Sequence, residues 1–207
     1  MSRTRVKFCG ITRVDDAQHA GELGADAIGL VFAPRSLRAL AIADAARIAE
    51  VTPAFVARVG LFLDADPDFV RSVIAAVALD ALQFHGSEPR EYCASFGMRY
   101  IKAVAMGDGV EFETRARAYP DAAALLLDSH ASGGQGGTGA RFDWARVPRA
   151  YAQPIVLAGG LTADNVADAI AIARPYAVDV SSGIEARPGI KDSGKMQRFL
   201  DEVRRAG

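Results

Sequence analysis

Cysteine, histidine and tryptophan are scarce in this chain of 207 residues, which contains two, three and one of them. The two cysteines, Cys9 and Cys93, lie far apart and form no disulfide framework, which suits a reducing compartment. The histidines, His19, His85 and His130, lack the spacing of metal ligands, and there is no Cys-x-x-Cys pair. The sequence therefore predicts neither a disulfide-rich fold nor a metal site.

Long apolar runs and an excess of one charge are also missing. No stretch approaches the ~18 apolar residues of a membrane span, and no charged start precedes an apolar signal core. Lys and Arg number 24 against 25 Asp and Glu, for a formal net charge of −1. No basic stripe interleaved with aromatic residues appears. We therefore expect a cytoplasmic protein that binds neither a membrane nor nucleic acid.

Half of the residues are hydrophobic, and they fall into short runs that alternate with helix-like segments. The runs resemble β-strands and begin roughly 20 to 30 residues apart, which is the size of a repeated βα unit. Eight are present: Val6–Ile11, Ala27–Phe32, Arg58–Leu63, Ala81–His85, Tyr100–Ala105, Ala124–Asp128, Pro154–Ala158 and Ala177–Ser181. Runs that are apolar on both faces and joined by helices favour a parallel sheet. The pattern predicts an α/β fold, a single-domain (βα)8 TIM barrel over residues 1–207, with a doubly wound open sheet as the alternative.

Local signals predict several helix boundaries. One helix ends at Gly24, a suitable C-cap, and another has Asp66 as its N-cap and Pro67 at its first position. A third is expected to begin at Thr162. The segment Arg141–Val147 is too short for a full crossover helix.

Polar residues gather where the predicted strands end, which is where barrel enzymes carry their chemistry. A buried strand does not need polar residues at this point. Those in question are Cys9, Arg35, Arg38, His85, Asp128, Gly159, Gly160, Ser181, Ser182 and Gly183. This clustering predicts an enzyme.

The seventh and eighth runs lead into "LAGGL" and "DVSSGIE". Small residues let backbone N–H groups approach an anion, and the N-terminus of a following helix adds a favourable dipole. Loops at these two places form the usual phosphate site of such barrels. We therefore expect Gly159, Gly160, Ser182 and Gly183 to bind a phosphate group, the alternative being that the glycines only turn the chain.

A third glycine-rich stretch, "SGGQGGTG", contains the pattern G-x-G-x-x-G at Gly134, Gly136 and Gly139. This fingerprint binds dinucleotides when it joins a strand directly to a helix. Here it lies several residues beyond the run that ends at Asp128, and no long helix follows. A mobile loop over Gly133–Gly139 that closes over a substrate fits the composition better.

Acid and base candidates stand on the first and sixth runs. Lys7 and Cys9 lie two residues apart in a strand and therefore share a face. A buried structural thiol is one interpretation of Cys9, and a base whose thiolate Lys7 favours is the other. A buried lysine needs a partner, and we expect Asp179 on the neighbouring eighth strand. Asp128, at a desolvated mouth, is expected to have a raised pKa that suits a general acid, unless it serves as a helix cap or in a loop salt bridge.

In order along the chain, the motifs "KFCGIT", "GLVFAPRSLR", "LQFHG", "LLLDS", "GGTG", "FDW", "LAGGL" and "VDVSSGIE…PGIKD" resemble those of phosphoribosylanthranilate isomerases. The similarity extends from the first strand to the last helix. It implies one barrel without a cofactor that catalyses the third step after chorismate in tryptophan biosynthesis. In that step N-(5′-phosphoribosyl)anthranilate undergoes an Amadori rearrangement to 1-(2-carboxyphenylamino)-1-deoxyribulose 5-phosphate.

The resemblance also implies roles for single residues. Asp128 matches the general acid that protonates the furanose ring oxygen, and Cys9 matches the general base that removes the proton from C2′. Arg38 matches the arginine that binds the anthranilate carboxylate, because a planar guanidinium orients a carboxylate. Arg35 is a second candidate for that contact. His85 is expected to line the pocket without a chemical step.

Two other functions share some of these sequence features. Another phosphosugar isomerase, or one with two substrates, would share the phosphate loops but not the set Cys9, Arg38 and Asp128. A non-catalytic sensor of phosphate ligands would be expected to lack the acid and the base. The composition fits a monomer or a homodimer. Ala39 stands where many members of the family carry an aromatic residue, which concerns the packing of the second loop rather than the chemistry.

Overall fold

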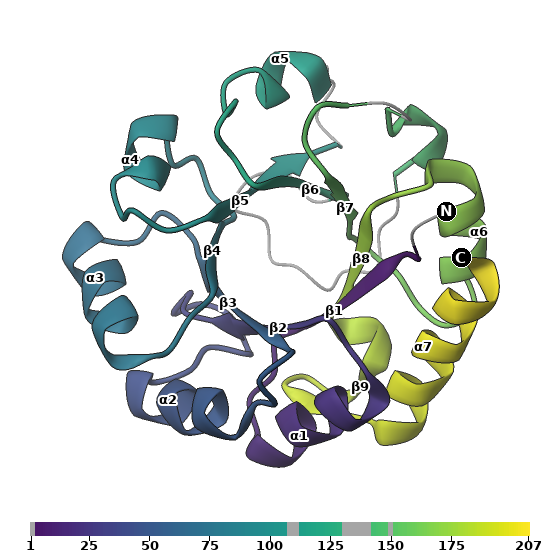
Figure 1. Ribbon diagram of the computed structural model, residues 1–207, viewed down its shortest axis with the longest axis horizontal. Coiled ribbons are helices and arrows are strands. Elements are labelled where there is room, and N and C mark those ends of the chain that lie inside the picture. Colours follow the sequence, from purple (N-terminus) through teal and green to yellow (C-terminus); the bar gives the residue numbers. More distant parts are fainter. Residues whose placement is uncertain (1–2, 107–111, 130–141, 149–150) are drawn as a thin grey trace.

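Eight parallel strands close into a barrel in the computed structural model, which describes residues 3–106, 112–129, 142–148 and 151–207 (Figure 1). The strands pair in chain order, and the eighth closes the ring against the first. They are β1 (Arg5–Cys9), β2 (Ala27–Val31), β3 (Ala57–Phe62), β4 (Ala81–Phe84), β5 (Tyr100–Ala105), β6 (Ala124–Asp128), β7 (Ile155–Leu157) and β8 (Ala177–Val180). The predicted barrel is confirmed, and the open-sheet alternative is wrong.

Helices form an outer layer around this ring (Figure 1). They are α1 (Val14–Leu23), α2 (Ile42–Val51), α3 (Pro67–Ala76), α4 (Arg90–Ala94), α5 (Phe112–Ala116), α6 (Val166–Ala173) and α7 (Ser193–Ala206). Two 3-10 helices, η1 (Trp144–Arg146) and η2 (Ser182–Ile184), and a hairpin of β9 (Glu185–Arg187) and β10 (Ile190–Lys191) also occur. Within the described residues, η1 is the only helix between β6 and β7, which agrees with the prediction for that segment.

Two predicted helix boundaries are confirmed. The residue after α1 is Gly24, whose φ of 86° lies in the left-handed region that favours glycine. The Asp66 side chain caps α3 by accepting hydrogen bonds from the backbone N–H groups of Asp68 and Phe69, and Pro67 is the first helical residue. These signals are local, because a cap depends only on residues within one turn of the chain.

The start of α6 differs from the prediction, since the helix begins at Val166 and not at Thr162. The Asn165 side-chain oxygen accepts a hydrogen bond from the Thr162 N–H, and its Nδ2 donates to the Gly160 carbonyl. Asn165 therefore closes a turn ahead of the helix. This turn also ties the loop after β7 to the N-terminus of α6.

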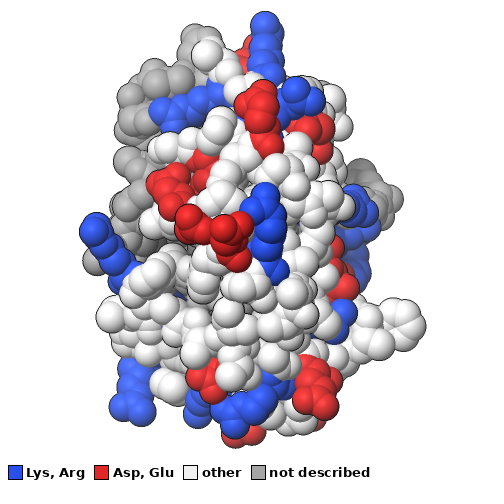
Figure 2. All heavy atoms as spheres, turned by 90° about the vertical axis from the view of Figure 1, so that its left-hand side faces the viewer, with Lys and Arg blue, Asp and Glu red and all other residues white. Residues whose placement is uncertain are grey.

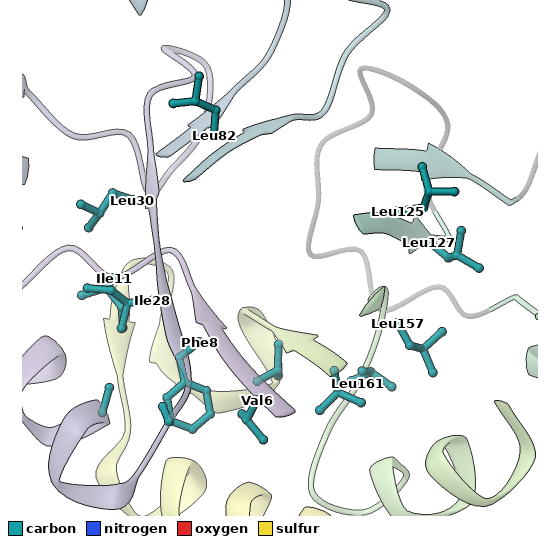
Figure 3. Close-up of a cluster of buried hydrophobic side chains, with 14 of the residues drawn as sticks. Val6, Phe8, Ile11, Ile28, Leu30, Leu82, Leu125, Leu127, Leu157 and Leu161 are labelled. Atoms are coloured by element: carbon teal, nitrogen blue, oxygen red, sulfur yellow. The ribbon is translucent and has the colours of Figure 1, made fainter. Parts of the chain in front are cut away.

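The main hydrophobic core lies between the outer face of the barrel and the helices. Figure 3 shows the side chains of Val6, Phe8, Ile28 and Leu30 on this outer side of their strands. The inner face carries a smaller cluster, made of Ala103, Ala124, Leu126, Val156, Ala158 and Ala177. Because successive residues of a strand point to opposite faces, β1 directs its large apolar residues outward and leaves the inner face to polar ones.

The outer surface is mixed in charge. On the face that carries α3 and α4, acidic and basic side chains are interspersed among uncharged ones (Figure 2). Among the helices of the described ranges, none is both long and apolar enough to cross a membrane.

Candidate active site

A cavity of about 310 Å³ opens at the C-terminal ends of the barrel strands. Seven of the predicted site residues line it: Cys9, Arg35, Arg38, His85, Asp128, Gly159 and Gly160. Ser181, which the sequence also places at a strand end, lines the cavity as well, whereas Ser182 and Gly183 are not among its lining residues within the described part of the chain. The barrel thus gathers residues from both ends of the sequence at one rim.

Cys9 is buried at the end of β1, above Lys7 on the same inner face. The expected partner of Lys7 is confirmed, because its Nζ donates to Asp179 Oδ1 at 2.9 Å in a buried ion pair. Burial raises the pKa of the Cys9 thiol above its usual value, although Lys7 and Lys191 favour the thiolate. Burial also opposes the charge of Lys7, but Asp179 and Cys9 hold the pKa of this lysine above its usual value.

Gly29 on β2 makes room for this pair. A Cβ atom at this position would lie 2.7 Å from Cys9 Sγ and 3.2 Å from Lys7 Nζ. Both contacts are shorter than side chains normally tolerate. The glycine therefore allows the thiol and the ammonium group to sit against the neighbouring strand.

Asp128 ends β6, where it is buried beside His85 at the mouth of the cavity. His85 Nε2 lies 3.5 Å from Asp128 Oδ2, and His85 Nδ1 lies 3.3 Å from the amide nitrogen of Gln83. Gln83 is fully buried on β4, one residue short of that strand's end. The sequence analysis did not identify Gln83, although its inward position follows from the alternation of β4.

The loops after β7 and β8 need glycines because neighbouring atoms lie too close for a Cβ atom. Gly159 and Gly160 have φ values of 86° and 65°, and a Cβ on Gly159 would lie 2.5 Å from Ser129 Oγ. A Cβ on Gly183 would lie 2.0 Å from the Leu161 carbonyl oxygen. Gly183 thus lets the two loops pack against each other. For the backbone N–H groups of Gly159 and Gly160, no acceptor is found within the described ranges.

The two candidate arginines differ in their surroundings. Arg38 is held by Glu185, which accepts hydrogen bonds from Arg38 Nε at 2.7 Å and Nη2 at 2.6 Å. Arg35 is exposed, and the described residues offer it no ion-pair partner. Glu185 and Lys191 belong to the motif "VDVSSGIE…PGIKD", but the sequence pattern predicts no role for either residue.

An apolar wall forms one side of the cavity. Val31, Ala33, Leu61 and Leu63 from β2, β3 and the residues after them pack beside Cys9. In a ring of eight strands, β2 and β3 stand across from β6 and β7, which carry Asp128 and the Gly159–Gly160 turn. The cavity therefore has an apolar end near the arginines and a polar end near the glycines.

Some predictions concern residues outside the described ranges. The G-x-G-x-x-G pattern, the predicted Gly133–Gly139 loop and His130 all lie there. Within the described residues, no three His, Cys, Asp or Glu side chains gather as metal ligands.

Known proteins match this chain over almost its full length. The sequence profile of the family described as N-(5'phosphoribosyl)anthranilate (PRA) isomerase matches residues 6–202. The N-(5'-phosphoribosyl)anthranilate isomerase of Nitrosococcus oceani is 50% identical over 201 residues, which are 97% of this chain and 98% of that protein. The enzyme of Pseudomonas paraeruginosa is 51% identical over 207 residues, covering 100% and 98% of the two chains.

Solved structures agree with these matches. The phosphoribosyl anthranilate isomerase of Thermotoga maritima is 40% identical with a TM-score of 0.87, covering 97% of this chain and 98% of that one. A phosphoribosyl anthranilate isomerase in complex with reduced 1-(o-carboxyphenylamino)-1-deoxyribulose 5-phosphate is 39% identical with a TM-score of 0.83 and the same coverage. The chain is an enzyme of the N-(5'-phosphoribosyl)anthranilate isomerase family.

Proposed function

We propose that this enzyme rearranges N-(5′-phosphoribosyl)anthranilate to 1-(2-carboxyphenylamino)-1-deoxyribulose 5-phosphate in tryptophan biosynthesis, with Cys9 as the base and Asp128 as the acid. The observation that carries the proposal is the two-ended cavity, with a thiol and a carboxylate on its inner wall. The solved relative that holds the reduced product supports the same class of ligand.

The two ends of the cavity suit the two ends of the substrate. The aromatic ring would rest on the wall of Val31, Leu61 and Leu63, with its carboxylate at Arg38. The phosphate would bind at the other end, where the described residues offer no acceptor to the Gly159 and Gly160 N–H groups. Ser182 and Gly183 would extend this phosphate site, since Gly183 packs against Leu161 in the adjoining loop.

The chemistry needs one proton donor and one proton acceptor. Asp128 would protonate the ring oxygen, so that the C1′–O bond breaks and the nitrogen lone pair forms a cationic Schiff base. Cys9 would then take the proton from C2′, which the adjacent cation acidifies, and the resulting enolamine becomes the ketone by tautomerisation. The cationic Schiff base and Lys7 would together stabilise a thiolate that burial by itself disfavours.

The experiment follows the loss of anthranilate-type fluorescence when freshly generated substrate meets the enzyme. Cys9→Ala and Asp128→Asn are each expected to lower kcat by about 10²–10⁴-fold, the usual contribution of a general acid or base. Cys93→Ala is the matched control, because Cys93 is buried on α4 and does not line the cavity. Near wild-type turnover by both site variants would contradict the assignment of the acid and the base. Turnover of a phosphosugar that lacks the anthranilate ring would instead support the alternative, another or dual-substrate phosphosugar isomerase.

The remaining expectations belong to the same proposal. We take residues 1–207 to act as one domain in the cytoplasm, without a cofactor, as a monomer or a homodimer. Analytical ultracentrifugation of the purified chain distinguishes the two oligomeric states.

A further inference from the structure

Glu185 stands where the rim of the barrel meets the β9–β10 hairpin. It is the first residue of β9, and only 4% of its side chain is exposed. Its two oxygens accept hydrogen bonds from two different nitrogens of Arg38, at 2.7 and 2.6 Å. A fork of this kind fixes the plane of a guanidinium as well as its distance from the carboxylate.

Glu185 accepts hydrogen bonds from the Nε–Nη2 edge of the Arg38 guanidinium and from neither N–H group of Nη1. Arginine has five N–H groups, and Glu185 accepts from the one on Nε and from one on Nη2. The stem of Arg38 is held as well, because a Cβ on Gly10 would lie 2.4 Å from Arg38 Cδ. With stem and one edge fixed, and with Arg38 lining the cavity, the Nη1 side is the edge for which the described residues offer no hydrogen-bond acceptor.

Lys191 anchors the carboxylate from behind. Its side chain is fully buried, and its Nζ donates to Glu185 Oε1 at 2.9 Å. The same Nζ donates to the carbonyl oxygens of Cys9 at 2.7 Å and Ser181 at 3.1 Å. One carboxylate therefore stands between two cations, so these three side chains carry a net charge of +1 beside the cavity, which favours an anionic ligand.

We infer that Glu185 is a positioning residue that holds the Arg38 guanidinium in the orientation needed to recognise the carboxylate of the substrate's aromatic ring. The inference rests on the proposed contact between Arg38 and that carboxylate. Glu185 is not among the described residues that line the cavity, so it would act on the substrate only through Arg38. Its removal therefore affects ligands that carry the carboxylate and spares ligands that lack it.

The test compares two ligands on four proteins. The ligands are the reduced product and the same compound with a phenyl group in place of the carboxyphenyl group. The proteins are the wild type, Glu185→Gln, Arg38→Lys and Glu88→Gln. Glu88 is the matched control, because it also forms a buried pair with a lysine, Lys102 at 2.9 Å, but contacts no arginine in the described structure.

Glu185→Gln keeps the shape of the side chain but replaces one accepting oxygen by a donor that opposes Arg38. We expect it to weaken binding of the reduced product by roughly tenfold or more, the scale of a hydrogen bond to a charged group. Binding of the phenyl compound is expected to change by less than about twofold, and Glu88→Gln to leave the ratio between the two ligands unchanged. In turnover, the variant should raise KM more than it lowers kcat.

Each outcome has one meaning. If Arg38→Lys and Glu185→Gln both lose discrimination between the ligands, the inference holds. If Arg38→Lys loses it and Glu185→Gln does not, the inference is overturned while the proposed carboxylate contact stands. If Arg38→Lys keeps it, the proposed contact fails. Equal weakening of both ligands by Glu185→Gln and Glu88→Gln would reduce Glu185 to a structural role and overturn the inference.

A second variant covers the case in which Glu185→Gln does not fold. Glu185→Asp keeps the charge beside Lys191 but is one methylene shorter, so it cannot reach both nitrogens of Arg38 in the present geometry. It should show a smaller loss that is again confined to the ligand with the carboxylate. An unchanged affinity ratio in this variant, together with a changed ratio in Arg38→Lys, would overturn the inference.

Discussion

Two buried lysines stand on opposite sides of the barrel in almost the same setting, Lys191 near β8 and β1, and Lys102 on β5 (Figure 1). Each donates to two backbone carbonyl groups and one glutamate. The difference lies in the glutamates. Glu88 accepts from the backbone N–H groups of Asp64 and Gly86, whereas Glu185 accepts from the backbone N–H of Gly189 and also from the side chain of Arg38. The Lys102–Glu88 pair thus binds backbone groups, whereas the Lys191–Glu185 pair also binds a side chain that lines the cavity.

This contrast separates stability from recognition. A buried ion pair by itself is weak evidence for a gain in stability, because desolvation offsets much of the attraction between the charges. Both lysines donate hydrogen bonds to backbone carbonyl groups at strand ends and in loops, which satisfies buried polar atoms. Only the pair at Glu185 also orients a side chain that lines the cavity.

The largest effect is expected from removal of the lysines. Lys102→Met should lower the free energy of unfolding by about 3–5 kcal/mol, because it leaves the buried Glu88 carboxylate without its lysine partner. Lys191→Met should lower it by less, because Arg38 still pairs with the Glu185 carboxylate. Only Lys191→Met should also lower turnover per folded molecule, since its Nζ supports the Cys9 carbonyl. Denaturant unfolding measures the first quantity and the fluorescence assay the second. Equal losses of turnover in the two variants would contradict the proposed difference between the Lys191–Glu185 and Lys102–Glu88 pairs.

A second pair of variants adds a methyl group to a glycine, once beside the cavity and once in the outer core. Gly29→Ala should displace Cys9 Sγ and lower kcat by roughly tenfold or more, because small misplacements of reacting groups are costly. Gly60→Ala meets the flexible side chain of Leu79 at 2.7 Å. It should cost about 1–3 kcal/mol of stability, as overpacking does, with kcat unchanged. A normal kcat for Gly29→Ala would show that Cys9 tolerates the shift.

The smallest effect concerns acid. Burial raises the pKa of Glu185, but Arg38 and Lys191 more than compensate and hold it below the usual 4.5. The unfolded chain then binds the proton more readily, so the stability from Glu185 is present above about pH 4.5 and is lost as the pH falls through the lower, folded-state pKa. We expect the free energy of unfolding of the wild type to fall more steeply with decreasing pH than that of Glu185→Gln. Parallel pH dependence of the two proteins would contradict this assignment of charge.

Several parts of the site were predictable because they depend on strand register. Lys7 and Asp179 are 172 residues apart, yet their pairing follows from a closed barrel in which β8 lies beside β1. Cys9 and Asp128 also followed from the rule that the strands of a barrel end at one rim. Periodicity and local caps accounted for the strands and for the boundaries at Gly24 and Asp66.

Other parts were not predictable, because they depend on how loops pack. Arg38 and Glu185 are 147 residues apart and meet only because the β9–β10 hairpin reaches the rim beside the second loop. Glycine at 183 was read as a phosphate contact, and the structure adds that it makes room for the Leu161 carbonyl. The start of α6 was misplaced because the Asn165 side chain completes a turn ahead of the helix.

The barrel, its inner and outer faces, and the strand ends that carry the acid and base candidates were therefore predictable from the amino-acid sequence. These follow from alternation along each strand and from the repeat of βα units, which are properties of neighbouring residues. Three-dimensional packing was needed to see which charged groups share a buried carboxylate and which of the two arginines is held at the rim. Those outcomes depend on distances and desolvation between loops, and the order of residues along the chain does not specify either quantity.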